Sequence, residues 1–568
     1  MAYVVPGFPG REPWKNADLA SFGVMKAMAA GQTAWWHPSV LGYPAETPAW
    51  LPYWLGALFI QVFPAFPELA SRIPFLAALV LTLFFTWNAV YRFALLPGAQ
   101  PVVFAFGGQA HPVDYARALA DSGLMALMAC LGLAQLSHEA TPSVFQAMSI
   151  AALLHASALF SHPKKASNAV AMSCWLGGLL SLGLSGQPLL ATVIGGALPL
   201  LLSRLHRTRA LFANGSQGQE SGLWTSTWAT WSIGTVLALA SLALLIGIAE
   251  APHQTPNIGD GVSFVRLLVW FTWPVWPLGL WTAWRWRKHF HHSHLAIPLL
   301  FSGLIAFASL SQDGSDRVLL LALPAMSVLA AFALPTLRRS VSALIDWFSV
   351  LFFSASALII WIIWVAMLTG YPTKPASNVI RLAPGFKAEF EGISFSLAVI
   401  ATVAWLLVVA WRLGRHQAAI WKSMVLPATG GALCWLLLMT LWLPLLDYGR
   451  SYGPIARRIA TLIPPGSCVH IQGLSQAQIV GLMHHGHLDL RRWTREQGCP
   501  TLVTSPENRP TVEQAGSSWK FQARVNRLND RRESLLLFTR VPAIENVDPV
   551  PGQQTREEDE PDPTETAM

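Results

Sequence analysis

The chain has 568 residues and a net charge of +8, and 53% of its residues are hydrophobic while only 12% are charged. With a mean hydropathy of +0.43, it has more apolar surface than a soluble protein of this size can bury, which predicts an integral membrane protein. Its basic residues lie in short clusters between apolar segments, where they orient a chain in the bilayer. The positive charge therefore does not imply nucleic-acid binding.

The N-terminal segment, residues 1 to 71, is expected outside the membrane. Residues 1 to 9 have neither a basic region nor an apolar run long enough for a signal peptide. We therefore expect a further spanning helix upstream of Met1, omitted by a start site placed too far downstream.

Residues 10 to 54 form a polar, acidic and tryptophan-rich loop directly before the first apolar run. The loop contains Asp18 and Glu46, and its tryptophans are typical of a chain that lies at the bilayer interface. Residues 51 to 63 are apolar but too short to cross the bilayer, which predicts an interfacial helix. We interpret this loop as the catalytic segment.

Residues 72 to 446 are expected to form the transmembrane domain. About twelve runs are long enough to span the hydrocarbon core. They lie near residues 72–94, 117–136, 144–161, 167–184, 187–204, 225–249, 263–284, 295–311, 316–335, 345–369, 393–413 and 422–446. The sequence thus predicts a mainly α, polytopic transmembrane fold.

Lysine and arginine gather in alternate loops between these runs, and such loops face the cytoplasm. The clusters are Arg92 with Arg117, Lys164 with Lys165, Arg204 with Arg207 and Arg209, Arg285 with Arg287 and Lys288, Arg338 with Arg339, and Arg412 with Arg415 and Lys422. Residues 1 to 71 and the C-terminus are therefore predicted to face outward.

Residues 447 to 545 have a mixed polar composition with helix-like and strand-like segments, which predicts a small extracytoplasmic α/β domain. Cys468 and Cys499 each neighbour a strand-like run in this domain, and an oxidising compartment favours a disulfide between them. Residues 546 to 568 are acidic, rich in proline and free of aromatic residues, which predicts a disordered tail.

Several segments resemble one family. PWKNADLASFG at 13–23 and AAGQTAWWHPSVLGYPAETPAWLPYW at 29–54 resemble the first outer loop of bacterial aminoarabinose transferases. These enzymes belong to the polytopic GT-C glycosyltransferases of the protein-mannosyltransferase-like superfamily. Weaker similarity extends through SHEATP at 137–142, FTWPVWPLGLW at 271–281 and DRVLLLALPA at 316–325.

The resemblance implies a GT-C fold with one further span and transfer of a sugar from an undecaprenyl-phosphate donor. The acceptor would be a lipid or a glycan, with protein as another option, at the outer face of the bacterial cytoplasmic (inner) membrane. Asp18 and Glu46 match the acids of the two loop elements, Tyr53 matches the aromatic element, and His138 with Glu139 match the second outer loop. Ala17 and Thr47 stand where that family has an acid and a lysine.

Glycosyl transfer needs a carboxylate that assists the acceptor and groups that stabilise the leaving phosphate. Asp18, Glu46 and Glu139 are the catalytic candidates, although an acid near a helix N-terminus is also favourable without any function. The basic candidates for phosphate binding stand near membrane level, where a plain interfacial anchor is equally common; they are Lys15, Arg317 and Arg450. His138 and Glu139 could equally form a surface turn.

The histidine-rich segment 287–294 lies in a basic loop without supporting acids and makes a weak metal site, and nothing else indicates a cofactor. Two alternatives to an enzyme remain. Ala17 and Thr47 are consistent with a catalytically degenerate relative that acts as a partner or scaffold. A transporter is disfavoured, because ionisable residues lie near the ends of the predicted spans rather than deep within them.

Overall fold

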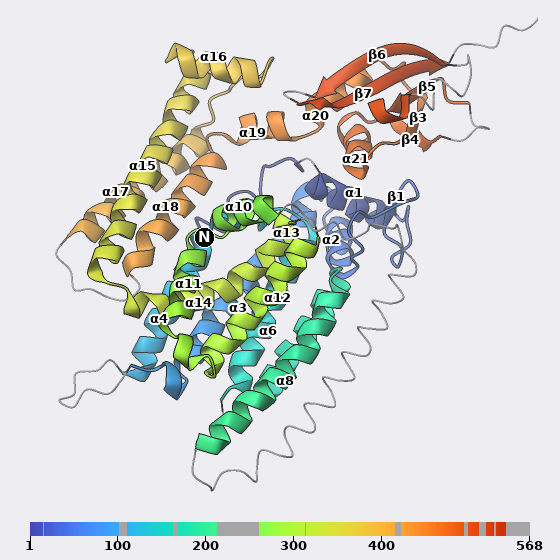
Figure 1. The fold of residues 1–568 in the computed structure, drawn as a ribbon. Coiled ribbons are helices and arrows are strands. Elements are labelled where there is room, and N and C mark those ends of the chain that lie inside the picture. Colours follow the sequence, from blue (N-terminus) through green and yellow to red (C-terminus); the bar gives the residue numbers. More distant parts are fainter. Residues whose placement is uncertain are drawn as a thin grey trace, which may run out of the picture.

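The structure, a computed structural model, describes residues 1–14, 16–101, 111–162, 168–212, 261–312, 314–414, 422–493, 498–509, 519–527 and 530–540. Most of it is a helical bundle with a small mixed sheet at one end (Figure 1). The N-terminal half contains α1 (Ala17–Ala29), β1 (Ser39–Val40), β2 (Tyr43–Pro44), α2 (Leu51–Val62), α3 (Pro67–Ala94), α4 (Pro112–Met128), α5 (Leu131–Leu136), α6 (Pro142–Phe160), α7 (Asn168–Leu184) and α8 (Pro188–Phe212). There follow α10 (Gly261–Phe271), α11 (Val275–Arg285), α12 (Ser293–Ser311), α13 (Asp316–Leu319), α14 (Leu323–Ala333), α15 (Arg339–Thr369), α16 (Thr373–Leu382), α17 (Gly392–Leu413), α18 (Lys422–Leu438) and α19 (Leu443–Arg450).

The helices confirm a mainly helical, multi-pass membrane protein. Among the described residues, seven helices are long and apolar enough to cross a bilayer, or eight if the bent pair α18 and α19 is one span. The helix α2 occupies the segment predicted to be interfacial. The predicted run at 225–249 lies outside the described residues.

Three of the predicted spans are not continuous helices, which corrects the sequence-based expectation. The run at 422–446 divides into α18 and α19, which are bent by 70°, and the other two breaks lie side by side. The run at 117–136 divides into α4 and α5, and the run at 263–284 divides into α10 and α11 near Pro274, which has no N–H to continue a helix. These two breaks meet, because the Leu131 N–H donates to the Trp273 carbonyl oxygen over 3.2 Å. Each break thereby satisfies a polar group that the other exposes.

The interior of the bundle is formed by α3, α6 and α14, which pack against one another, with α4 packed on α3 and α7 on α6. Phe75 of α3 meets Phe145 of α6 edge to face, with ring centroids 5.2 Å apart. In contrast, α15 and α17 stand at one side of the bundle with α18, and most of their apolar surface faces outward (Figure 1). Such outward apolar surface is expected where helices face lipid.

A two-residue hairpin separates α1 from α2. Val40 pairs with Tyr43, and both turn residues, Leu41 and Gly42, have positive φ (50° and 77°). Positive φ at both positions is the backbone of a type I′ turn, which suits a tight hairpin. The segment that contains Glu46 begins directly after the second strand of this hairpin, β2.

The C-terminal region folds into a five-stranded mixed sheet with helices α20 (Gly453–Ala460) and α21 (Gln476–His485). The strands β3 (Cys468–Gln472), β4 (Asp489–Arg492), β5 (Thr501–Thr504), β6 (Trp519–Arg527) and β7 (Asp530–Arg540) lie in the order β4-β3-β5-β7-β6. β3 is parallel to β4 and β5, whereas β7 is antiparallel to β5 and β6. The predicted disulfide joins Cys468 to Cys499, with Cα atoms 5.3 Å apart, which confirms that prediction.

Candidate functional site

Asp18 lies at the centre of the first loop and is almost completely buried, with 1% of its side chain exposed. Its Oδ2 lies 3.0 Å from Nη2 of Arg11 and accepts the Trp14 backbone N–H over 3.0 Å. Its Oδ1 accepts the backbone N–H of Ala140 over 2.8 Å. Asp18 therefore joins the N-terminal segment, α1 and the turn before α6.

The charges around Asp18 keep it ionised. Burial alone raises the pKa of Asp18, but the Arg11 and Arg72 guanidinium groups and the two backbone N–H donors outweigh it, and the pKa is lowered. Arg11 is itself buried and donates to the carbonyl oxygens of Gly7 and His138, each over 2.9 Å. With all its oxygens engaged by protein donors, Asp18 has the geometry of a positioning residue.

Glu139 and Arg317 form a second ion pair close to Asp18. Arg317 Nη2 lies 2.7 Å from Glu139 Oε2, and Arg317 Nη1 donates to Thr141 Oγ1 over 3.2 Å. The other Glu139 oxygen accepts from Gln135 Nε2 over 3.0 Å. The Glu139 side chain is 5% exposed and that of Arg317 is 29% exposed. Glu139 thus holds a guanidinium group that remains partly open to a ligand.

Glu46 differs from Asp18 because its side chain is exposed. Partial desolvation by the surrounding loop raises the pKa of the Glu46 carboxyl, while the Arg317 guanidinium acts in the opposite sense. The two side chains are therefore close enough for their charges to interact. An accessible carboxyl with a raised pKa can exchange a proton with a bound ligand.

The segment around Glu46 is held from two sides. Gly186, at φ 94°, lies against this segment, and a Cβ there would come within 2.8 Å of the Pro48 carbonyl oxygen. The Trp50 N–H donates to the Leu184 carbonyl oxygen over 2.8 Å. Buried Tyr53 donates its hydroxyl to the Thr47 carbonyl oxygen over 3.3 Å. Through this hydrogen bond Tyr53 supports the loop, and burial raises the pKa of the Tyr53 hydroxyl.

Arg450 stands at the end of α19 with its guanidinium 4.9 Å from the centroid of the Trp14 ring. The Arg11 guanidinium also contacts the Trp14 ring, 4.5 Å from its centroid. The Trp14 indole N–H donates to Asp447 Oδ1 over 2.7 Å. The structure therefore brings Arg450 to the first loop by cation–π contact. The hydrogen bond to Asp447 fixes the tryptophan that both arginines contact.

His138 lies in the interior, between α5 and α6. Its ring lies 4.6 Å from the Trp435 ring and 5.0 Å from the Phe8 ring, and Nε2 is 2.9 Å from the Tyr3 carbonyl oxygen. Burial lowers the pKa of His138 to about 4, although hydrogen bonds to backbone carbonyls oppose this effect. These contacts favour a packing role over the predicted contact with substrate. Lys15, the remaining predicted site residue, lies outside the described residues.

Three residues that shape the site were not predicted from the sequence: Arg11, Asp447 and Gln476. Gln476 accepts a hydrogen bond from the Glu46 backbone N–H over 3.1 Å, although the two residues are 430 positions apart in the sequence. Arg11 is an isolated arginine in an irregular loop, which no periodic pattern places inside a protein. The one usable signal was Asp447, the first acid after the last apolar run.

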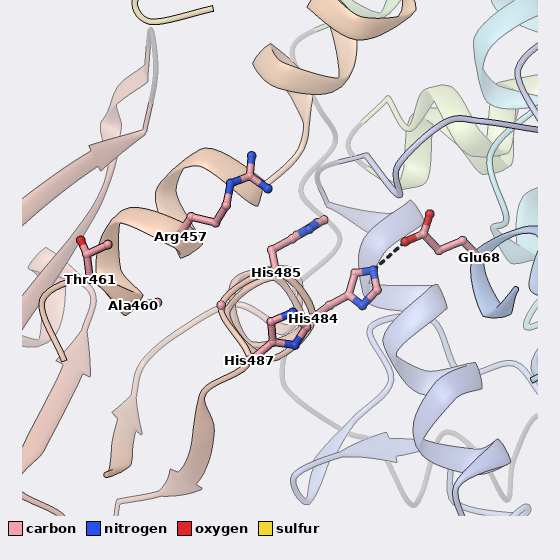
Figure 2. Close-up of a pocket in the computed structure, with 8 residues that line it drawn as sticks. Glu68, Arg457, Ala460, Thr461, His484, His485 and His487 are labelled. Carbon is pink, nitrogen blue, oxygen red and sulfur yellow. Dashed lines mark hydrogen bonds and ion pairs between the residues drawn. The ribbon is translucent and has the colours of Figure 1, made fainter. Parts of the chain in front are cut away.

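The described residues contain no group of three or more histidine, cysteine, aspartate or glutamate side chains that could hold a metal ion. They do form a depression of about 670 Å³ between the C-terminal domain and the start of α3 (Figure 2). It is lined by Glu68, Arg457, Ala460, Thr461, His484, His485, Gly486 and His487. Neither Asp18 nor Glu46 lines this depression, so it is separate from the candidate site.

No protein-family model and no curated protein sequence matches this chain. Among solved structures, the chain is similar to ArnT from Cupriavidus metallidurans bound to undecaprenyl phosphate, with a TM-score of 0.61 and 15% identity over 95% of this chain and 96% of that one. The same protein in its apo state gives a TM-score of 0.57 and 16% identity over 94% and 95%. At this level of identity the similarity establishes the fold. The chain has the GT-C membrane glycosyltransferase fold of ArnT.

Proposed function

We propose that this chain is a membrane glycosyltransferase that moves a sugar from a polyprenyl-phosphate donor to a lipid or glycan acceptor. The observation that carries the proposal is the exposed carboxyl of Glu46 within electrostatic reach of the partly exposed guanidinium of Arg317. Transfer from a glycosyl phosphate requires a base for the acceptor and a cation for the leaving phosphate. The GT-C fold, shared with a protein crystallised with undecaprenyl phosphate, supports the same assignment.

In the proposed reaction, an acceptor hydroxyl attacks the anomeric carbon of the donor. Its proton passes to the Glu46 carboxylate as the new C–O bond forms. The bond from the anomeric carbon to the phosphate oxygen breaks, and the polyprenyl phosphate leaves with the electron pair. Arg317 would stabilise this phosphate by charge-assisted hydrogen bonds, and Arg450 would be the second cation to assist.

The other predicted site residues then act mainly by position. Glu139 holds Arg317 in place by the ion pair, and Tyr53 supports the backbone of Thr47. Asp18 fixes the Ala140 backbone next to Glu139, which ties the first loop to the second. These assignments replace a direct catalytic role for Asp18 with an indirect one.

We further propose that residues 1–71 and the C-terminal domain face the outer side of a bacterial cytoplasmic membrane. The support is the gathering of lysine and arginine in alternate loops. The division into an outer loop (1–71), a transmembrane domain (72–446), an α/β domain (447–545) and a tail (546–568) is part of the same proposal.

A second candidate function is that of a catalytically degenerate partner. The specific observations in its favour are the burial of Asp18, which leaves it no free oxygen for a ligand, together with Ala17 and Thr47 in the first loop. Such a protein would bind the polyprenyl phosphate without transferring the sugar.

The test is turnover of undecaprenyl-phosphate sugars by the purified protein in vesicles. Glu46→Gln should lower the rate by about 10² to 10⁴, since it removes the base and keeps the shape of the side chain. Glu389→Gln, the same change at another exposed position, is the matched control and should leave the rate unchanged. Wild-type protein that binds undecaprenyl phosphate but transfers no sugar would favour the partner function instead.

A further inference from the structure

Helix α21 of the C-terminal domain lies directly on α1 of the first loop (Figure 1). The two helices approach so closely that a Cβ at Gly23 of α1 would come within 2.1 Å of Val480 Cγ2. A Cβ at Gly481 of α21 would come within 2.6 Å of Tyr452 Cβ and within 3.5 Å of Leu19 Cδ2 of α1. Glycine at both positions allows this contact, which fixes α21 against the loop that contains Glu46.

Gln476 is the first residue of α21, and both ends of its carboxamide contact the loop. Its Oε1 accepts the Glu46 backbone N–H over 3.1 Å, and its Nε2 donates to the Pro44 carbonyl oxygen over 3.5 Å. The side chain is buried, with 6% exposed. Ser475 and Gln478 form a capping box that fixes the start of α21 and therefore the place of Gln476.

The far end of α21 is also attached to the membrane part. His484 Nε2 lies 2.8 Å from Glu68 Oε1 at the start of α3 (Figure 2). The His484 ring stands edge to face on Phe22 of α1, with centroids 5.0 Å apart. The helix is thus held at both ends, so Gln476 cannot move away from the loop without breaking contacts elsewhere.

We propose that Gln476 is a positioning residue for Glu46, so that the C-terminal domain completes the candidate active site of the membrane domain. The inference rests on the proposed function, because it assigns a catalytic purpose to the position of Glu46. It is specific to Glu46, since Arg317 is held separately by Glu139 and Thr141. Loss of Gln476 should therefore impair transfer and leave the binding of donor phosphate intact.

The variant for the test is Gln476→Met, which keeps the length of the side chain and removes both hydrogen bonds. Gln522→Met is the matched control, because Gln522 is an exposed residue of β6 in the same domain. A displacement of about 1 Å at a reacting group can lower a rate by up to roughly 10²-fold. We expect a fall in kcat of about 10-fold to 10²-fold in Gln476→Met, with the Kd for undecaprenyl phosphate unchanged.

Hydrogen exchange at the Glu46 amide tests the contact without any need for turnover. Its exchange should accelerate in Gln476→Met and stay the same in Gln522→Met. The neighbouring Ala45 amide donates to the Pro38 carbonyl oxygen over 3.0 Å, so it should be unaffected and serves as the internal reference. Unchanged exchange at Glu46, or faster exchange with an unchanged kcat, overturns the proposal.

The double variant Gln476→Met with Glu46→Gln separates this inference from the proposed function. If Gln476 acts through Glu46, the double variant should be no slower than Glu46→Gln alone. Full additivity of the two effects would overturn the positioning role. If Glu46→Gln alone transfers sugar at the wild-type rate, the catalytic assignment of Glu46 fails, and the exchange result still decides whether Gln476 holds the loop.

Discussion

Asp18→Asn should destabilise the protein strongly, and the structure gives the magnitude. The substitution keeps the shape of the side chain but removes the charge that compensates Arg11, whose remaining hydrogen bonds go to the carbonyl oxygens of Gly7 and His138. Removal of one partner of a buried ion pair costs roughly 3 to 5 kcal/mol. Asparagine also has one acceptor oxygen in place of the two that receive backbone N–H groups, which adds about 1 kcal/mol. We expect a loss of about 4 kcal/mol or more in the free energy of unfolding.

The assay is thermal unfolding of the purified protein in detergent, followed by the folded fraction in size-exclusion chromatography. Asp489→Asn is the control, because Asp489 forms an ion pair with Arg491 at the same 3.0 Å but both side chains are more than half exposed. An exposed pair contributes about 0 to 1 kcal/mol, so this variant should melt close to wild type.

Equal melting temperatures for Asp18→Asn and Asp489→Asn would refute the reasoning. Asp18 would then not be held in a buried pair, and a direct role in transfer would become the better explanation of its place in the loop. Glu46→Gln provides the opposite comparison. Its side chain is exposed, so it should lose activity without any loss of stability.

Four further predictions test other parts of the structure. Arg317→Met should weaken binding of undecaprenyl phosphate, measured by titration in detergent, whereas exposed Arg338→Met should not. The transfer rate should fall as the pH drops through the raised pKa of Glu46, because only the carboxylate accepts a proton. A transfer rate that stays constant from neutral pH down to the ordinary pKa of glutamate would contradict this role. An impermeant maleimide should label Gln32→Cys and not His291→Cys in intact cells, against a wild-type background; the reverse pattern refutes the orientation. Peptide mass mapping without reductant should recover Cys468 linked to Cys499, and two free thiols in protein from the native membrane would contradict the disulfide.

The sequence was sufficient for features that depend on local patterns. Apolar runs predicted most of the membrane helices, and the short run after Trp50 predicted α2, because each pattern reports how one segment meets the bilayer. The strand-like runs beside Cys468 and Cys499 likewise predicted the C-terminal fold and its disulfide. Where a run was long but broken, as at Pro274, hydropathy alone could not show the break, since apolar residues continue on both sides.

The candidate site was harder to predict because its contacts join distant segments. Asp18 and Glu46 look equivalent in the sequence, yet the structure buries one in an ion pair and leaves the other exposed. Asp18 is buried because it binds Arg11 and the Ala140 N–H. Neither residue can be recognised as its partner from residue type or spacing in the sequence. Likewise, Gln476 is an ordinary helix residue until the fold places it against Pro44 and Glu46.

The long sequence separation between these partners also sets the order in which the site can form during synthesis. The N-terminal segment is synthesised before its partners. Asp18 can bind the Ala140 N–H, the Pro6 carbonyl oxygen can accept from the Trp435 indole, and the Glu46 N–H can bind Gln476 only after each partner has been synthesised. Contacts of such long range form late in folding. A nascent chain that has just inserted its last membrane helix therefore still lacks the residue that holds Glu46, and the candidate site is complete only after the C-terminal domain has folded onto α1.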